Sequence, residues 1–362
     1  MNRYLYRSIY NKIKSRALRV VAIKIYGALK QPYYRISVDT NNLCNLKCVM
    51  CSLSLPGGKS SSQIMSLTQF ESLAKEVFPK TRILDLSCGF EPFMTKNFID
   101  YIRVARKFCQ GHIAICTNGL LIKESTIDRI LNENLLDEIT ISIDGLSPET
   151  YNSIRINGNF RDLLQVLEAL KEAKTKIKSN RKLFLRLNYT LMRRNIEELI
   201  GIHDFASKYS IDCLQLRHMR LTSEFTHLFS ESLYFHQELS DRILKIVCKD
   251  KRPGSKITIM TPPLFSDTKG VLTTKNSCVY PWFNFSIFSD GSVKLCNFGK
   301  IGNFIDSGFK SIEASARLKE IRQGLLQGKY KKYCHDCHRI TDVMDVHDVS
   351  SFIQGDLGLR YD

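Results

Sequence analysis

The sequence has no long run of apolar residues. The longest one near the start is Val20 to Ile23, far shorter than the roughly 20 residues that a helix needs to cross a membrane. Nothing at the start has the basic, apolar and small-residue order of a signal peptide. We therefore expect a soluble, cytoplasmic protein, in which the 12 cysteines are ligands, core residues or redox groups rather than disulfides.

Acidic residues are absent from residues 1–31, a segment that carries eight of the basic residues behind the net charge of +17. Its apolar residues recur at roughly helical spacing. One interpretation is a terminal helix that packs on its own domain. The other is a basic amphipathic helix that contacts an anionic membrane at its periphery or holds an anionic partner. Nucleic acid is not an expected partner.

A fourth cysteine is missing beside three that stand close together. In the stretch NNLCNLKCVMC, residues 41–51, the spacing of Cys44, Cys48 and Cys51 is C-x3-C-x2-C. A structural zinc site closes with four ligands, and disulfides need an even number of cysteines. Three thiolates in one loop therefore suggest a metal centre that is open on one side.

Short β-branched runs alternate with longer amphipathic segments from Tyr34 onward, which argues for parallel βαβ units. The expected strands are Arg35–Asp39, Ile83–Ser87, His112–Cys116, Glu138–Ile143, Leu183–Tyr189 and Asp212–Leu216. The expected helices are 67–79, 97–108, 123–133, 161–177 and 195–208. The pattern suits a partial TIM-like barrel or an open doubly wound sheet, and in both the site lies at the C-terminal ends of the strands.

Polar groups recur where four of these strands end. SCGFEP (87–92), CTNG (116–119), SIDG (142–145) and LNYT (187–190) each follow or close a strand. Glycine and proline alone would only indicate turns. Four polar strand ends around the cysteine loop indicate a site.

The loop CNLKCVMC after a first strand resembles the signature of the radical S-adenosylmethionine (SAM) superfamily. The resemblance implies a partial (β/α)6 TIM-like barrel with a [4Fe–4S] cluster on Cys44, Cys48 and Cys51, whose open iron binds SAM. It also implies reductive cleavage of SAM to a 5′-deoxyadenosyl radical that abstracts a hydrogen atom. The electron donor would be of the flavodoxin or ferredoxin type.

Two further motifs of this superfamily have counterparts here. GFEP resembles the Gly-Gly-Glu-Pro motif that holds the methionine amino group, so Gly89 and Glu91 map onto it, although Phe90 replaces the usual second glycine. Ser142 of SIDG and Arg155 of YNSIR resemble the pair that contacts the SAM ribose and carboxylate. A cation suits that carboxylate.

Four more residues stand where the superfamily places SAM contacts. Met50 lies inside the cluster loop and Leu216 on the sixth strand, both expected near adenine. Asn118 and Asn188 stand at strand ends suited to SAM. Each of the four, taken alone, is equally consistent with an ordinary loop or core residue.

A second cysteine group follows residue 277. Cys278, then Gly291-x4-Cys296 after a hairpin that turns at 289–291, then Cys334-x2-Cys337 resemble the auxiliary-cluster domain of SPASM and Twitch radical SAM enzymes. No cysteine follows Cys337, which resembles the shorter Twitch type, a β-hairpin plus a helix, and implies one fully ligated auxiliary [4Fe–4S] cluster. A four-cysteine zinc site is the alternative.

These patterns divide the chain into a basic arm, a radical SAM core, a bridging region, an auxiliary-cluster domain and a tail: residues 1–31, 32–225, 226–276, 277–345 and 346–362. Of the remaining cysteines, Cys109 and Cys248 are expected in the core. Cys88, Cys116 and Cys213 lie in or beside strands, as buried small side chains or as hydrogen donors to a substrate radical.

The nearest resemblance is to Twitch dehydrogenases of aminocyclitols and sugars. It implies a two-electron oxidation of a sugar, aminocyclitol or glycan precursor, with the auxiliary cluster as electron acceptor. Two alternatives stay open. One is a maturase of ribosomal peptides, against which we count the roughly 31 residues before the first strand, too few for a leader-binding domain. The other is a cysteine-dependent radical epimerase.

Overall fold

A computed structural model describes residues 33–55, 61–87, 89–176, 183–219, 223–250, 257–268, 280–327 and 329. Several predicted features lie outside these residues: the arm 1–31, the tail 346–362, and four cysteines, Cys88, Cys278, Cys334 and Cys337.

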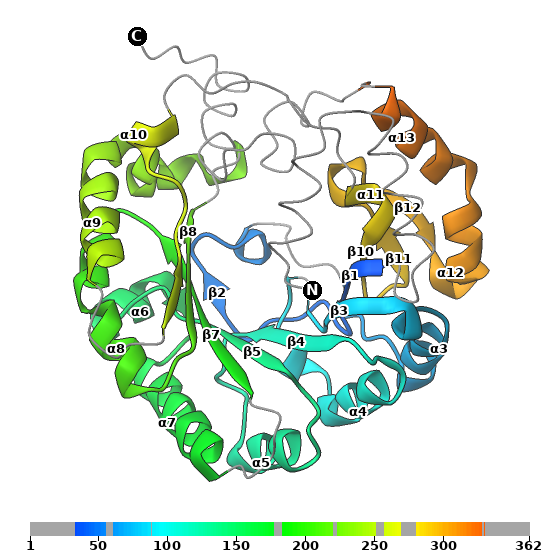
Figure 1. Cartoon of the computed structure of the whole chain (residues 1–362), viewed down its shortest axis with the longest axis horizontal. Coiled ribbons are helices and arrows are strands. Elements are labelled where there is room, and N and C mark those ends of the chain that lie inside the picture. The colour runs from blue at the N-terminus through cyan, green and yellow to red at the C-terminus, as the bar shows by residue number, and fades with distance from the viewer. Residues whose placement is uncertain are drawn as a thin grey trace.

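Six parallel strands form the centre of the fold, and they neighbour one another in chain order (Figure 1). They are β1 (Tyr33–Val38), β3 (Thr81–Asp85), β4 (His112–Thr117), β5 (Glu138–Ser142), β7 (Phe184–Leu191) and β8 (Cys213–His218). Each pairs in parallel with the next. The predicted α/β fold with a partial (β/α)6 barrel is confirmed.

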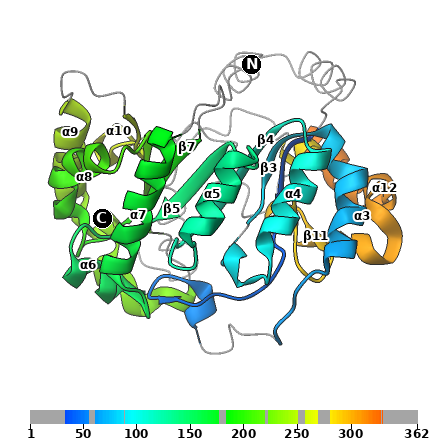
Figure 2. The same cartoon turned by 90° about the horizontal axis from the view of Figure 1, so that it is seen from below.

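Helices cover the outer face of this curved sheet (Figure 2). They are α3 (Leu67–Val77), α4 (Phe98–Phe108), α5 (Glu124–Asn132), α7 (Phe160–Lys176), α8 (Ile202–Lys208) and α9 (Gln237–Lys249). The alternation in β7 explains the layering: Leu185, Leu187 and Tyr189 are buried towards the helices, while Arg186 and Asn188 on the inner face are half-buried. The apolar core therefore lies between sheet and helices, and the inner face is polar.

Two elements depart from the prediction. The last predicted strand of the core is Asp212–Leu216, but β9 (Thr258–Met260), in the predicted bridging region, adds a further parallel strand beside β8. A short helix, α6 (Pro148–Ile154), stands between β5 and β7; the Ser147 hydroxyl accepts a hydrogen bond from Thr150 N at its start. Both are short, so neither shows a clear period in the sequence.

The C-terminal hairpin extends the same sheet at its other edge. β10 (Asn284–Ile287) pairs in parallel with β1, and β11 (Ser292–Lys294) and β12 (Lys300–Asn303) follow antiparallel. The predicted turn at 289–291 is present, with Gly291 at φ +78°. Tyr33 of β1 packs edge-on against the rings of Phe285 and Phe309, which tie this unit to the core.

The other elements are short, apart from two helices of the C-terminal unit. They are β2 (Lys47–Cys48), β6 (Arg155–Ile156), α10 (Phe265–Thr268), α11 (Tyr280–Phe283), α12 (Phe304–Ala314), α13 (Ala316–Leu326) and the 3-10 turns η1 (Ser52–Ser54), η2 (Phe78–Lys80), η3 (Pro92–Met94), η4 (Ile196–Gly201), η5 (Ser223–Glu231), η6 (Leu233–His236) and η7 (Cys296–Phe298). The predicted helix 195–208 is thus η4 followed by α8.

Cys109 is buried at the end of α4, as predicted, whereas Cys248 of α9 is exposed and its predicted place in the core is wrong. Among the described residues, no helix has the length and apolar character of a membrane span.

Candidate functional site

The cysteine loop leaves the end of β1 and is fixed by a small sheet of its own. β2 pairs antiparallel with β6, so that Cys48 stands opposite Arg155. Val49 N donates to Ile154 O at 2.9 Å. The loop therefore lies against the end of α6, although it follows β1 in the chain.

The three thiols of the loop lie half-buried and close enough to affect one another. Burial raises the pKa of Cys48 to about 11, and Arg155 opposes this rise. The pKa of Cys44 is also raised by burial, and a neighbouring thiolate at Cys51 adds to it. Such mutual repulsion between thiolates is what a bound cation relieves.

No three acidic, histidine or cysteine side chains among the described residues converge on a position for a single metal ion. A cubane cluster does not need that convergence, because each cysteine binds a different iron. Half-buried thiols on one short loop fit a [4Fe–4S] cluster better than a lone ion.

The GFEP segment is tied directly to the cysteine loop. Glu91 N donates to Leu43 O at 2.9 Å. The Glu91 carboxylate is 2% exposed and accepts from Thr117 Oγ1 at 2.7 Å and from Asn118 N at 2.8 Å. Burial nevertheless raises the pKa of Glu91. Gly89 has no atom within 4 Å of the place where a Cβ would stand, so no steric reason for glycine is visible there.

Asn118 lies beside the first cysteine of the loop. Its amide nitrogen donates to Asn45 Oδ1 at 2.8 Å and lies 4.0 Å from Cys44 Sγ. Asn118 therefore orders the loop, and a contact from it to SAM stays a prediction.

Arg155 is buried among protein groups rather than open to a ligand. It is 7% exposed, pairs with Asp144 at 2.6 Å, and lies 3.9 Å from Cys48 Sγ. The sequence prediction placed it on the carboxylate of SAM. The structure brings it to a cysteine of the loop, and a contact from it to SAM stays a prediction.

A strip of polar side chains crosses the inner face at the C-terminal ends of the strands. Cys116 Sγ lies 3.7 Å from Ser142 Oγ, and Asn188 Nδ2 lies 3.6 Å from the same sulfur. With its amide suitably oriented, Gln215 donates to Asn188 Oδ1 at 3.2 Å and accepts from Arg217 Nε at 2.8 Å. Sequence reasoning missed Gln215 and Arg217, although their alternation with Leu216 on β8 is the signal that could have found them.

Two predicted SAM contacts do not join this strip. Leu216 pairs in register with Tyr189, is 2% exposed and packs in the core on the helix side of the sheet. The prediction that its side chain meets adenine inside the barrel is therefore wrong. Met50 packs on a small apolar cluster that includes Ile154 and Met192, at the edge of the cysteine loop.

The predicted hydrogen donors are placed differently from one another. Cys116 lies on the inner strip, and burial raises its pKa. Cys213 is 1% exposed and lies 3.3 Å from Arg186 Nη1. Cys116 is therefore the one of these two that adjoins the predicted SAM contacts.

One cysteine of the second group lies in the described part of the C-terminal unit. Cys296 is exposed two residues after the end of β11, with a left-handed φ of +47°. The hairpin thus presents its thiol at a turn and outside the core, and its role as a cluster ligand stays a prediction.

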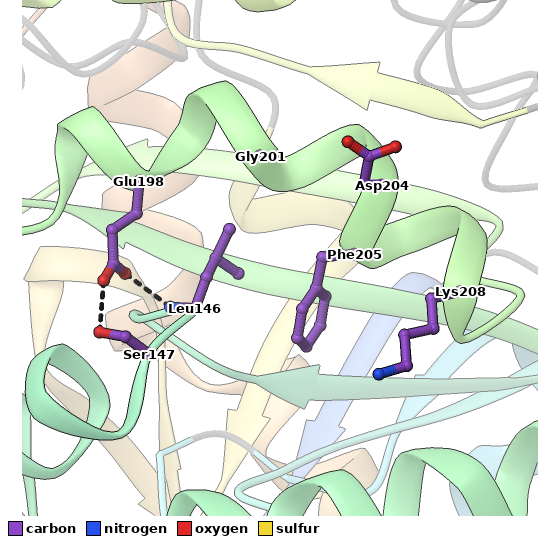
Figure 3. Close-up of a pocket in the computed structure, with 7 residues that line it drawn as sticks. All are labelled: Leu146, Ser147, Glu198, Gly201, Asp204, Phe205 and Lys208. Carbon is purple, nitrogen blue, oxygen red and sulfur yellow. Dashed lines mark hydrogen bonds between the residues drawn. The ribbon is translucent and has the colours of Figure 1, made fainter.

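A groove on the outer surface is separate from all these residues. Its lining is Leu146, Ser147, Glu198, Gly201, Asp204, Phe205 and Lys208 (Figure 3). Glu198 accepts from Leu146 N at 2.6 Å and from Ser147 Oγ at 2.5 Å, so its carboxylate braces the start of α6. No predicted site residue lines this groove.

Two family models match the chain. The model described as the radical SAM superfamily matches residues 38–206, and the SPASM model, described as an iron-sulfur cluster-binding domain, matches residues 278–338.

Among curated relatives, the chain is 34% identical over 200 residues to a GTP 3′,8-cyclase of Alkaliphilus metalliredigens, which covers 52% of this chain and 56% of the relative. It is 27% identical to a probable GTP 3′,8-cyclase of Sulfurisphaera tokodaii, over 58% of this chain and 63% of the relative. The chain thus spans less than two thirds of the length of either relative.

Two solved structures share the fold. One is anSMEcpe with bound AdoMet, with a TM-score of 0.64, 17% identity and coverage of 90% of this chain and 97% of that one. The other is Streptococcus suis SuiB bound to S-adenosylmethionine, with a TM-score of 0.65, 15% identity and coverage of 90% and 75%.

Proposed function

Since the chain belongs to the radical SAM superfamily and carries a SPASM iron-sulfur cluster-binding domain, we propose that it is an oxidoreductase that removes two electrons from a sugar, an aminocyclitol or a glycan precursor. When bound, the cofactors supply the chemistry: reduced SAM yields methionine and a 5′-deoxyadenosyl radical that takes a hydrogen atom from a hydroxyl- or amine-bearing carbon, and the auxiliary cluster accepts the second electron.

The chain's own residues would divide the remaining work. Cys44, Cys48 and Cys51 would hold the SAM cluster. Ser142 and Asn188 would orient SAM on the inner face. The proton that leaves the substrate heteroatom would pass to solvent or to a polar side chain of the strip.

The polarity of the strip is the observation that carries the choice of substrate class. Beside the predicted SAM contacts stand the amide of Gln215 and the exposed guanidinium of Arg217. The Gln215 amide can bond hydroxyl groups, and the Arg217 guanidinium can bind an anionic group. A substrate that carries hydroxyl and anionic groups therefore fits this face better than an apolar one.

Three alternatives have some support. The curated relatives are GTP 3′,8-cyclases, so a purine nucleotide is a candidate. SuiB has been solved with its precursor peptide, which keeps a peptide substrate in view. Cys116 on the strip favours an epimerase.

Two predicted partners also stay predictions. One is an electron donor of the flavodoxin or ferredoxin type, and the other is an anionic membrane that residues 1–31 would contact.

The test is an anaerobic panel with reconstituted enzyme, SAM and dithionite: an aminocyclitol, a hexose phosphate, GTP and a cysteine-containing peptide. We expect one 5′-deoxyadenosine per oxidised product with the aminocyclitol or the hexose phosphate. Substrate-dependent product from GTP or the peptide alone would contradict the proposal.

Variants separate oxidation from epimerisation. Cys334→Ala or Cys337→Ala should stop product formation while SAM cleavage continues, with circular dichroism and iron content as checks that the domain stays folded. Cys116→Ala should retain product. Solvent deuterium at an inverted carbon, lost in Cys116→Ala, would make the enzyme an epimerase.

A further inference from the structure

We propose that Arg155 acts on the cluster of the cysteine loop: it fixes Cys48 in place and its positive charge raises the reduction potential of that cluster. The inference rests on the radical SAM part of the proposed function and not on the substrate. Arg155 is thus a positioning residue.

The first step is the placement of the guanidinium opposite the cysteine. Cys48 and Arg155 are 107 positions apart in the sequence but face one another in the β2–β6 pair. Arg155 Nη1 points to Cys48 Sγ at 3.9 Å. An N–H group directed at a thiolate stabilises its negative charge.

The second step is that protein groups occupy the other sides of the guanidinium. Nε donates to Ile143 O at 3.2 Å, and Nη2 pairs with Asp144 Oδ2 at 2.6 Å. With 7% exposure, Arg155 has little surface left for the carboxylate of SAM. These protein contacts therefore orient the guanidinium towards Cys48.

Asp144 is itself locked in place. It is fully buried, takes a left-handed φ of +60°, and accepts from Thr190 N at 2.6 Å through Oδ1. Its carbonyl oxygen accepts from Asn195 Nδ2 at 3.0 Å. The carboxylate is held by Thr190 of β7 and the main-chain carbonyl by Asn195, so Asp144 offers the guanidinium one geometry.

The third step is electrostatic. Arg155 meets Cys48 Sγ through Nη1 at 3.9 Å, whereas the Asp144 carboxylate binds a different nitrogen, Nη2. Since hydrogen bonds and charges near the sulfurs tune iron–sulfur potentials, a positive group directed at Cys48 favours the reduced cluster, which carries the extra negative charge.

The test is a potentiometric titration of the reconstituted enzyme, followed by electron paramagnetic resonance of the cluster signal that changes when SAM is added. No substrate is needed, so the result is independent of the substrate proposal. For Arg155→Met we expect a more negative potential, with about a tenfold lower ratio of reduced to oxidised cluster at a fixed potential, which is about 59 mV for one electron. Arg155→Lys should restore most of the shift.

Two further variants guard against misfolding and general charge effects. Arg155→Met with Asp144→Asn leaves no buried orphan charge, and its shift should have the same sign but be smaller. Arg186→Met is the matched control, because Arg186 pairs with Glu138 at 2.6 Å on the inner face and also bonds Cys213 Sγ of β8 and Met260 Sδ of β9. It should leave the potential unchanged.

Two outcomes would overturn the proposal. One is an unchanged potential in Arg155→Met with less iron, which would make Arg155 only structural. The other is an unchanged potential with a higher SAM concentration needed for the spectral change, which would return Arg155 to the carboxylate of SAM.

Discussion

His218, on the helix side of β8, has both ring nitrogens buried without a hydrogen-bond partner in the described part of the chain. Burial lowers its pKa to about 4, against a small opposing effect of Asp241. The unfolded chain binds a proton below about pH 6.5, whereas the folded chain does so only below about pH 4. Stability is therefore lost as the pH falls from about 6.5 towards 4.

We predict that His218→Phe removes this loss, because phenylalanine can pack against Phe265 as the imidazole does, at 4.9 Å between ring centres. The variant should gain about 1.4 kcal/mol over wild type at pH 5.5 and almost nothing at pH 7.5, from the protonation linkage alone. Thermal unfolding at both pH values measures this. An equal difference at the two pH values would contradict it.

At the same scale, the predicted metal ligands are easier to recognise in the sequence than the residues around them. Cys44, Cys48 and Cys51 form a local pattern that one loop displays. The role of Arg155 depends on the β2–β6 pair, which joins segments more than 100 positions apart, and no local pattern reveals that contact. The prediction for Leu216 is wrong for a simpler reason. Neighbouring side chains of a strand point to opposite faces of the sheet, so an error of one residue places the side chain on the other face.

At the scale of elements, Glu76 links the core to the C-terminal unit. This residue of α3 accepts from Phe309 N at 3.0 Å and from Lys310 N at 2.7 Å. Both donors follow the break in α12 at Gly308, whose φ is +71°. The carboxylate therefore caps a helix start in the other unit, where a negative charge is favourable.

We predict that Glu76→Ala loosens α12 by about 1.5–3 kcal/mol, the usual worth of hydrogen bonds to a charged group. Hydrogen–deuterium exchange at Phe309 and Lys310 should speed up accordingly. Glu71→Ala is the control: Glu71 stands on the same helix and pairs with Lys75 at 3.2 Å, away from α12. Unchanged exchange in Glu76→Ala would contradict this account of the link.

Sequence analysis found the elements that are long enough to show a repeating pattern of apolar and polar residues. β7 alternates over eight residues, and α4 and α7 show a clear apolar stripe. The three residues of β9 and the parallel pairing of β10 with β1 have no such signal, because register between distant strands is a tertiary property.

At the scale of the whole molecule, one ten-stranded sheet joins the barrel to the C-terminal hairpin. In Figure 1, β10 and β11 stand beside β1, and α12 and α13 lie outside them. The sheet therefore continues across the domain boundary that the sequence predicts at residue 277. Such continuity would hold an auxiliary cluster at a constant place relative to the barrel.

The central claim, that the cysteine loop holds a cluster that cleaves SAM, has one direct measurement. Anaerobically reconstituted enzyme and the variant with Cys44, Cys48 and Cys51 all changed to Ala are incubated with SAM and dithionite, and 5′-deoxyadenosine is quantified. The account predicts 5′-deoxyadenosine from the wild type and none from the variant, which should keep only the auxiliary cluster, about four irons of about eight. Equal 5′-deoxyadenosine from the variant would contradict it.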